Sequence, residues 1–196
     1  MDALTRNYEL QPSGMNRNSR STACSVNDGE AGKDPVFKAV LIYENLAAGA
    51  RARWFLERLA RASSKTLQEQ MWNFDVLWIR EVRNGAASTA RKADVVAVSV
   101  SGRLELPGAV RAWLDMWLWL LEDENPALVA LFDSFATPNV ASICAYLNRI
   151  AQRGGIEFFS AQRQVSLFPI VRPKEEAIWP ESVDRALLSW LKLPDE

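Results

Sequence analysis

Residues 93–118 read ADVVAVSVSGRLELPGAVRAWLDMWL and contain both kinds of element from which the fold is built. The first part, 94–101, is a run of small and β-branched apolar residues, which is typical of a strand buried on both faces. Pro107 follows at the start of a helical pattern, where its missing N–H costs nothing. Beyond it, large apolar residues recur every three or four positions. The segment therefore predicts a buried strand followed by an amphipathic helix.

The same change of period is repeated in both directions along the chain. Apolar or β-branched runs predict strands at 36–43, 74–79 (with a start as early as Leu67), 94–101, 127–132 and 156–160. Helical periods predict helices at 47–63, 86–93, 107–121 and 139–153, the last ended by Gly154 and Gly155. Strands and helices that alternate at this spacing imply parallel pairing through right-handed crossovers.

Five strands in this arrangement resemble a flavodoxin-like fold, an α/β three-layer sandwich with strand order 2-1-3-4-5 and helices on both faces. We expect this domain to cover residues 36–162. Residues 1–35 are polar, with few large apolar side chains, and predict a disordered tail. Residues 163–196 begin with loops broken by prolines and end in a helix over 180–191.

The composition excludes several chemistries. Histidine is absent, so there is no Ser-His-Asp or Cys-His catalysis, no phosphohistidine relay and no histidine-ligated zinc. The two cysteines, Cys24 and Cys144, form no CxxC pair, and Cys144 fits a small core position. The 23 basic and 24 acidic residues nearly balance, which predicts neither nucleic acid nor a membrane as partner.

Four arginines lie close together in the first predicted helix. They are Arg51, Arg53, Arg58 and Arg61. A solvated helix face is the simplest interpretation. No apolar run is long enough to cross a bilayer, and the N-terminus has no hydrophobic signal core, so we expect a cytoplasmic protein.

In parallel α/β folds, ligands bind outside the carboxyl ends of the strands, where the strand order reverses. Three segments should meet there: 44–49, 101–106 and 133–138. Glu44, Asp133 and Ser134 would then lie near one another, and two close carboxylates can perform acid–base chemistry. Asp and Ser at strand ends also commonly cap the next helix or turn, which is the alternative structural role.

The segment quoted first resembles the NADPH-dependent FMN reductase family. In that family a flavin-contacting loop follows the strand, a Pro-Gly pair opens a helix with a basic residue, and an Asp-Trp pair comes next. Pro107 and Gly108 match the pair, Arg111 stands for the basic residue, and Asp115 is in register, but Met116 replaces the tryptophan. The resemblance implies FMN as the candidate cofactor. If a site exists, its residues would be Asn45, Gly49, Ser101, Gly102, Arg103 and Ser134.

The flavin-contacting positions of that family are not retained. Its loop carries Pro-Glu-Tyr-Asn where this chain has residues 100–103, Val-Ser-Gly-Arg. Residues 44–49 contain no hydroxyl for an FMN phosphate, and Glu44 places a carboxylate at the mouth of that loop. One like-charge contact at ~4 Å costs about 4 kcal/mol at an effective dielectric constant of about 20. That exceeds the roughly 0.3–2 kcal/mol that a helix N-terminus contributes, so the loops favour no bound cofactor.

Response-regulator receiver domains share this winding and suggest a second comparison. Their phosphoryl site needs an acidic pair after strand one, an Asp after strand three, a hydroxyl after strand four and a Lys after strand five. Here Glu44 is followed by Asn45, strand three ends in serines without an Asp, and Arg163 replaces the Lys. Glu44 supplies one acid and Ser134 could supply the hydroxyl, but the acceptor Asp is missing, so any likeness is to a pseudo-receiver.

The eight tryptophans are many for a chain of this size. Trp113 and Trp117 fall on the predicted buried stripe and Trp119 falls off it. Because aromatic residues are enriched at protein interfaces, a protein partner or a homodimer through the helix after Pro107 is one expectation. A C-terminal extension folded over the same surface is the other.

Two functions remain open from the sequence. The first is a non-catalytic, pseudo-receiver-like module for protein interaction or signalling, which the degenerate loops and the absence of histidine favour. The second is a diverged FMN-dependent NAD(P)H oxidoreductase, which the Pro107–Gly108 to Asp115 segment favours. Whether the protein is an enzyme therefore stays undecided at this level.

Overall fold

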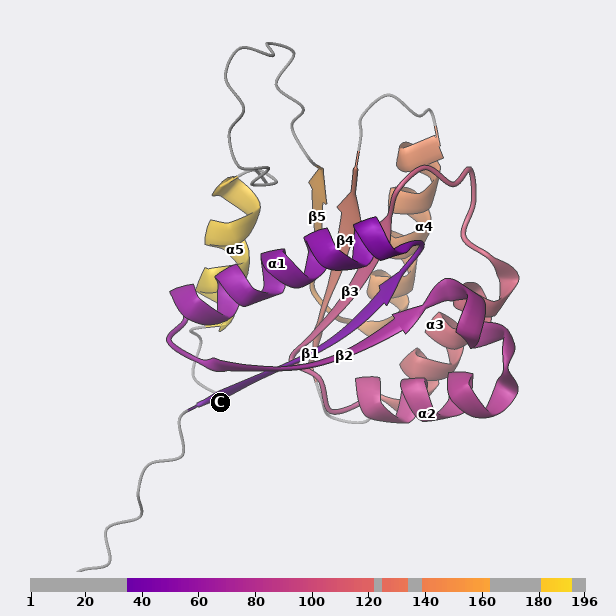
Figure 1. Cartoon of the computed structure of the whole chain (residues 1–196), viewed down its shortest axis with the longest axis horizontal. Helices are drawn as coiled ribbons and strands as arrows, with labels where there is room; N and C mark the ends of the chain where they lie inside the picture. Colours follow the sequence, from indigo (N-terminus) through magenta and orange to yellow (C-terminus); the bar gives the residue numbers. More distant parts are fainter. Residues whose placement is uncertain (1–34, 122–124, 134–138, 163–180, 192–196) are drawn as a thin grey trace, which may run out of the picture. The chain divides into compact units, whose positions relative to one another are not determined.

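The computed structural model describes residues 35–121, 125–133, 139–162 and 181–191, and the structural statements below concern these ranges. In chain order the elements are β1 (Val36–Tyr43), α1 (Leu46–Ala62), β2 (Thr66–Asn73), η1 (Phe74–Trp78), α2 (Arg80–Ala90), β3 (Val95–Val100), α3 (Gly108–Leu120), β4 (Ala127–Phe132), α4 (Asn139–Gly154), β5 (Phe158–Gln162) and α5 (Glu181–Leu191). The strands form one sheet in the order β2-β1-β3-β4-β5, and every neighbouring pair is parallel (Figure 1). The predicted winding is confirmed.

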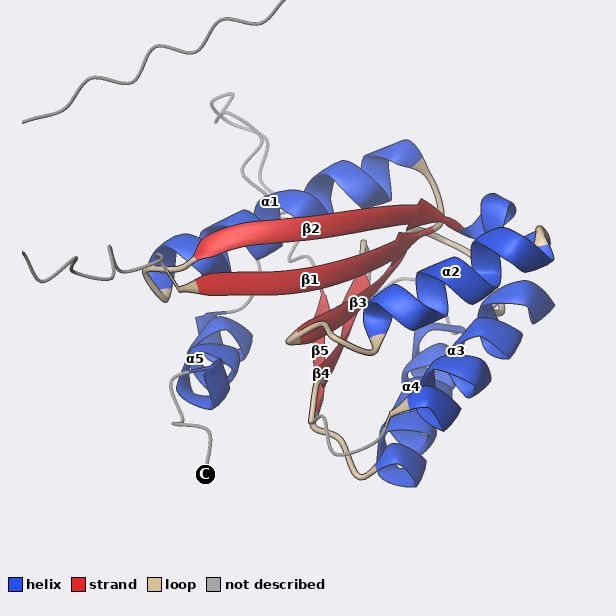
Figure 2. Ribbon diagram, turned by 90° about the horizontal axis from the view of Figure 1, so that it is seen from below, coloured by secondary structure: helices blue, strands red, loops and turns tan. Residues whose placement is uncertain are grey.

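The sheet is the middle of three layers. Helices α1 and α5 lie on one face, and α2, α3 and α4 lie on the other (Figures 1 and 2). Every residue of β3 and β4 is buried, which explains their uninterrupted apolar sequences. Each face of the sheet therefore has its own hydrophobic core, and both cores include side chains of β1, β3 and β4.

The second strand is the main correction to the sequence analysis. The predicted strand at 74–79 is wrong, whereas the early start at Leu67 is close to the structure, because β2 runs from Thr66 to Asn73 and Phe74–Trp78 forms a 3₁₀ helix. The Asn73 side chain ends the strand by accepting the Asp75 N–H at 2.8 Å. Strand β2 lies at the edge of the sheet and alternates exposed and partly buried residues. Its polar sequence therefore lacked the apolar run by which the central strands were recognised.

Two other boundaries differ from expectation by a few residues. Helix α2 begins at Arg80 rather than at 86, and β5 begins at Phe158 rather than at 156. The predicted stop after α4 is confirmed. The helix ends at Gly154, Gly155 has a positive φ of 63°, and the Ile156 N–H reaches back to the Ala151 carbonyl at 3.1 Å. The expected tail at 1–34 and the proline-containing segment at 163–180 lie outside the described residues.

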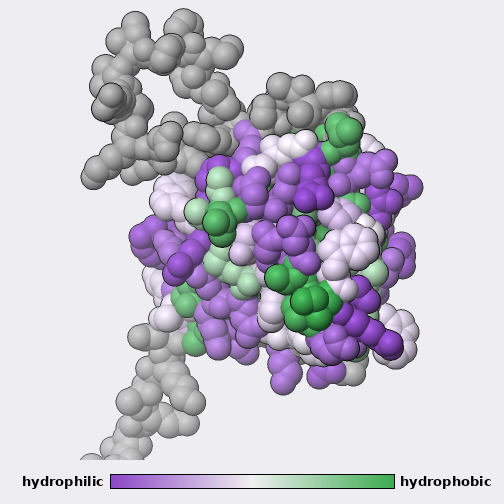
Figure 3. Space-filling model, turned by 45° about the vertical axis from the view of Figure 1, so that its right-hand side comes forward, coloured by the Kyte–Doolittle hydropathy of each residue, from purple (hydrophilic) through white to green (hydrophobic). Residues whose placement is uncertain are grey.

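The tryptophans of α3 lie as their spacing predicts. Trp113 and Trp117 are fully buried, and their rings stack with centroids 5.9 Å apart. Trp119 is 84% exposed. In the space-filling view of Figure 3, apolar side chains (green) form separate groups among polar ones (purple). No helix in the described ranges is both long and apolar enough to span a membrane.

Two arginines of α1 form ion pairs with residues of other elements. Arg53 pairs with Glu69 at 2.6 Å, and Arg58 pairs with Asp184 of α5 while its guanidinium lies 5.0 Å from the Trp54 ring. Arg53 and Arg61 are exposed, as a solvated face predicts, whereas Arg51 and Arg58 are partly buried. Arg53 and Arg58 connect α1 to the edge strand and to the terminal helix.

Candidate functional site

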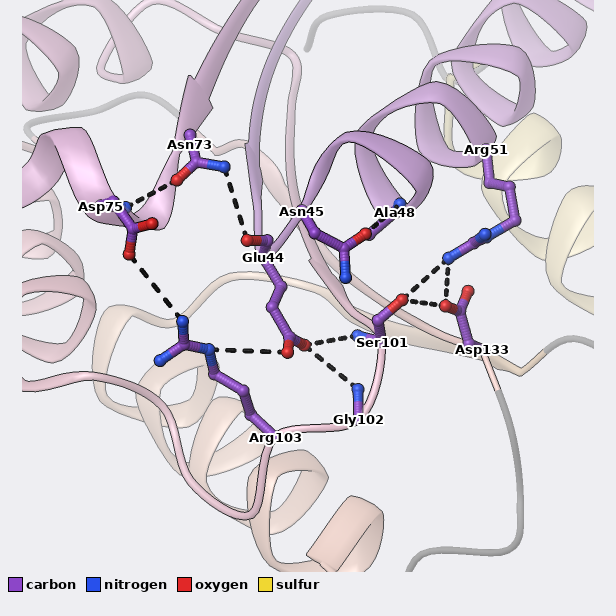
Figure 4. A network of polar contacts seen from close by, with 10 residues as sticks. All are labelled: Glu44, Asn45, Ala48, Arg51, Asn73, Asp75, Ser101, Gly102, Arg103 and Asp133. Carbon is purple, nitrogen blue, oxygen red and sulfur yellow. Dashed lines mark hydrogen bonds and ion pairs between the residues drawn. The ribbon is translucent and has the colours of Figure 1, made fainter.

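The segments after β1, β3 and β4 meet at one edge of the sheet, as the parallel winding predicts. Glu44 follows β1, Ser101 follows β3 and Asp133 follows β4. Both acids contact Ser101: Glu44 accepts its backbone N–H, and Asp133 accepts its hydroxyl (Figure 4). Ser134, the other residue expected here, lies outside the described residues.

The Glu44 side chain crosses from the end of β1 to the loop after β3. Its Oε2 accepts the Ser101 N–H at 2.7 Å and the Gly102 N–H at 3.1 Å. Its Oε1 lies 3.5 Å from the Nε of Arg103, whose guanidinium also lies 3.8 Å from Asp75 at the start of η1. Only 13% of the Glu44 side chain is exposed. Two successive backbone N–H groups and a cation therefore converge on one carboxylate (Figure 4).

A second cation lies beside this group. Arg51 of α1 donates to the Ser101 hydroxyl at 2.9 Å and forms an ion pair with Asp133. Its guanidinium is mostly withdrawn from solvent, with 22% of the side chain exposed. The sequence pattern places Arg51 on a solvated face and does not predict this role. Arg51 lies three residues after the buried Ala48, so the two share one helix face. This spacing is the sequence signal that Arg51 points toward the sheet edge.

Asn45 and Gly49 have local structural roles. The Asn45 side chain caps α1 by accepting the Ala48 N–H at 2.9 Å, which satisfies one of the free donors of the first turn. Gly49 packs under the aromatic ring of Tyr43: a Cβ at this position would lie 2.9 Å from a ring carbon. These contacts account for both residue types without a ligand.

The helix that carries the resemblance to the FMN reductases makes contacts away from this network. Arg111 pairs with Glu105 at 2.8 Å and lies 5.6 Å from the Tyr146 ring, and Asp115 pairs with Arg153 at 3.0 Å. Burial is the main reason that the pKa of Tyr146 is raised, with a further contribution from Asp115.

Two hollows lie near these elements. One of about 130 Å³ lies between the loop after β3 and helices α3 and α4, beside Leu104, Arg111 and Tyr146. The other, about 360 Å³, lies between α2 and the amino-terminal halves of β1 and β2, beside Lys38, Gln68 and Lys92. Within the described ranges, no group of three His, Cys, Asp or Glu side chains is placed to hold a metal ion.

Comparisons with known proteins reveal the fold. No protein-family model matches the chain, and no curated protein matches its sequence. Among solved structures, the apo form of an NADH:FMN oxidoreductase aligns with a TM-score of 0.54 and 17% identity, over 82% of this chain and 91% of the other. An oxidoreductase from Corynebacterium diphtheriae aligns with a TM-score of 0.51 and 9% identity, over 79% and 92%.

A flavodoxin from the domain Archaea also matches, with a TM-score of 0.47 and 7% identity, over 78% of this chain and 95% of the other. The strand order 2-1-3-4-5, with every neighbouring pair parallel, decides the fold. The fold is flavodoxin-like. At these identities the likeness establishes the fold and no more.

Proposed function

We propose that this protein is a flavin-binding flavodoxin-like protein, a diverged FMN-dependent NAD(P)H oxidoreductase that holds its ligand at the carboxyl edge of β1 and β3. The observation that carries the proposal is the convergence of the Ser101 and Gly102 N–H groups and the Arg103 guanidinium on one anion position. This position lies where the strand order of the fold reverses, which is where such folds bind ligands.

The surroundings also suit a ligand that is partly flat and apolar. Large apolar side chains are exposed in the segments that follow β1, β2 and β3. They are Leu46, Val76, Trp78, Ile79 and Leu104. Exposed apolar groups around a charged centre are typical of ligand or partner sites. The NADH:FMN oxidoreductase among the structural neighbours makes FMN the first ligand to test.

The loop after β1 does not fit the FMN phosphate. The Ala48 N–H is taken by Asn45, the Gly49 N–H donates to the Asn45 carbonyl at 2.9 Å, and the Tyr43 ring fills the space above Gly49. The donors that do fit a phosphate are the amides of Ser101 and Gly102 with Arg103. In the proposed complex these residues bind and orient the flavin, which itself supplies the hydride chemistry.

The first experiment is a fluorescence titration of the purified protein with FMN, with riboflavin as a ligand that lacks the phosphate. We expect FMN fluorescence to be quenched, and riboflavin to bind more weakly because it cannot reach the amides and the guanidinium. Arg103→Gln should weaken FMN binding by about tenfold or more, since a charged hydrogen bond contributes about 1.5–3 kcal/mol. Arg61→Gln, at an exposed position of α1 outside the residues of Figure 4, is the matched control.

A colourless protein that neither quenches FMN nor distinguishes it from riboflavin would contradict the proposal. One observation favours a second candidate, a non-catalytic interaction module. Glu44 already satisfies the donors, so the site as it stands needs no ligand, and the exposed apolar side chains at the same edge would then contact a protein. Absence of FMN binding in both the wild type and a Glu44→Ala variant would favour this candidate.

A further inference from the structure

We infer that Glu44 is an internal occupant of an anion site, and that a phosphate group binds the Ser101 and Gly102 amides by displacing it. The inference concerns the same edge of the sheet as the proposed function and names how that site is regulated. It is stated for a phosphate group in general, so it can be tested without flavin.

The geometry of Glu44 is that of a bound anion. One oxygen receives two hydrogen bonds from consecutive amides, at 2.7 and 3.1 Å, and the other faces the Arg103 guanidinium. Consecutive amides that point at one place form a nest, which binds carboxylate and phosphate oxygens alike. The carboxylate therefore stands where a phosphate oxygen of a ligand would make the same contacts.

A neighbouring cation makes the site larger than one carboxylate needs. Arg51 lies on the other side of Ser101. Both the Arg51 guanidinium and the Ser101 hydroxyl donate to the Asp133 carboxylate. A phosphate has more acceptor oxygens than a carboxylate, so it can use the amides and a guanidinium together. The Ser101 hydroxyl is already taken by Asp133, but the Arg51 Nε has no hydrogen-bond partner in the described residues, so Arg51 and Arg103 place two guanidinium groups beside the nest.

The Glu44 side chain can also move away from the amides without disrupting a helix or strand. It is the first residue after β1, and α1 is capped by its neighbour Asn45 rather than by Glu44 itself. Its backbone stays fixed, because its N–H donates to the Ser99 carbonyl at 3.0 Å and its carbonyl accepts from the Asn73 side chain at 3.4 Å. A change of side-chain rotamer is therefore sufficient to open the nest.

The consequence is competition between Glu44 and any anionic ligand. A ligand must replace two charge-assisted hydrogen bonds and accept a displaced carboxylate nearby, so wild-type protein should bind phosphate weakly. Removing the carboxylate should strengthen binding at the same amides. A rise in affinity on removing the carboxylate indicates that Glu44 competes with the ligand, which we call a plug. A fall in affinity indicates that Glu44 helps to bind the ligand.

The test is a titration with inorganic phosphate at constant ionic strength, followed by amide NMR shifts. We expect the dissociation constant to fall by about tenfold or more in Glu44→Ala, and the shifts to concentrate at Ser101 and Gly102. Glu57→Ala is the matched control, because Glu57 pairs with Arg53 on α1 and takes no part in the network. It should bind phosphate as the wild type does.

Equal affinities in the wild type and Glu44→Ala, shifts confined to other residues, or no binding by either would each overturn the inference. If Glu44→Ala does not fold, Glu44→Gln keeps the volume and one acceptor without the charge, and it should still show a smaller gain. No gain in Glu44→Gln would then overturn the inference.

The same variants keep this inference distinct from the proposed function. A Glu44→Ala protein that gains phosphate binding but never binds FMN supports the plug and contradicts the flavin proposal. A wild-type protein that binds FMN with an affinity unchanged by Glu44→Ala supports flavin binding, but it contradicts the phosphate position at Ser101 and Gly102 and overturns the inference about Glu44.

Discussion

Gly49 can be distinguished as a packing residue rather than a ligand-binding one. Alanine normally stabilises a helix by about 0.8–1 kcal/mol relative to glycine. At Gly49, however, the added Cβ would lie 2.9 Å from a ring carbon of Tyr43. Gly49→Ala should therefore lower the free energy of unfolding by about 1–3 kcal/mol, the usual cost of overpacking, measured by urea denaturation.

Gly85 of α2 provides the matched control for that measurement, because nothing lies within 4 Å of the position its Cβ would take. Gly85→Ala should therefore raise the free energy of unfolding by up to about 1 kcal/mol. If both substitutions stabilise the protein, the contact with Tyr43 does not restrict Gly49.

Glu69 gives a prediction about pH. Burial raises its pKa above the ordinary 4.5, and Arg53, which lowers it, does not compensate. A carboxyl with a raised pKa binds its proton more tightly in the folded state than in the unfolded state. Its contribution to stability is therefore lost as the pH rises above about 4.5. The wild type should lose stability relative to Glu69→Gln between about pH 4 and pH 7.

Arg53 allows the cause of that trend to be checked. Its Nε lies 2.6 Å from Glu69, and its charge holds the pKa of that carboxyl down. We therefore compare the single variant Arg53→Gln with the double variant Arg53→Gln/Glu69→Gln. As the pH rises, the single variant should lose unfolding free energy relative to the double variant more steeply than the wild type does relative to Glu69→Gln. A flat difference across the same range would contradict a raised pKa for Glu69.

At the scale of elements, the contact between α3 and α2 depends on a hydrogen bond from one tryptophan. The Trp117 indole N–H donates to the Ala90 carbonyl at 3.1 Å, whereas the equally buried Trp113 N–H has no partner in the described residues. Trp117→Phe and Trp113→Phe remove the same atoms. Trp117→Phe should cost about 0.5–1.5 kcal/mol more, because it removes a buried hydrogen bond, although the Ala90 carbonyl keeps the Ala93 N–H at 3.2 Å. Equal losses of unfolding free energy would refute this difference.

At the scale of the whole molecule, the proposed homodimer through α3 remains a prediction. Trp119 is the exposed aromatic side chain of that helix, and Trp78 of η1 is also exposed. We expect light scattering after size exclusion to give a dimer mass for the wild type and for Trp78→Ser. Trp119→Ser should give a monomer mass, because large aromatic anchors carry much of the energy of an interface. A monomeric wild type at high concentration would exclude this dimer.

The accuracy of the sequence analysis followed the burial of each element. Strands β1, β3 and β4 are central, and their apolar runs are visible in the sequence. Strand β2 is an edge strand with polar residues facing solvent, so its pattern was weaker than that of the apolar 3₁₀ helix beside it. The hydrophobic period of a segment indicates which of its faces are buried. It does not identify a strand such as β2, of which one face is exposed and the other only partly buried.

The candidate site was predictable only in part, for the same kind of reason. The parallel winding predicted that Glu44 and Asp133 would come to the same edge, and they do. It did not predict that Glu44 would occupy the amides of Ser101 and Gly102, or that Arg51 would reach Asp133. Those contacts depend on loop backbone geometry and on which rotamers the neighbouring side chains leave free.

The sequence by itself determined the alternation of strands and helices, their parallel pairing and the edge at which the three loops gather, because these follow from side-chain periods among residues close together in the chain. Only the tertiary structure decided what fills that edge. Glu44 and Ser101 are separated by 57 positions. No local period constrains a carboxylate and two amides so far apart, and their contact forms only when the packed sheet brings the two loops within hydrogen-bond distance.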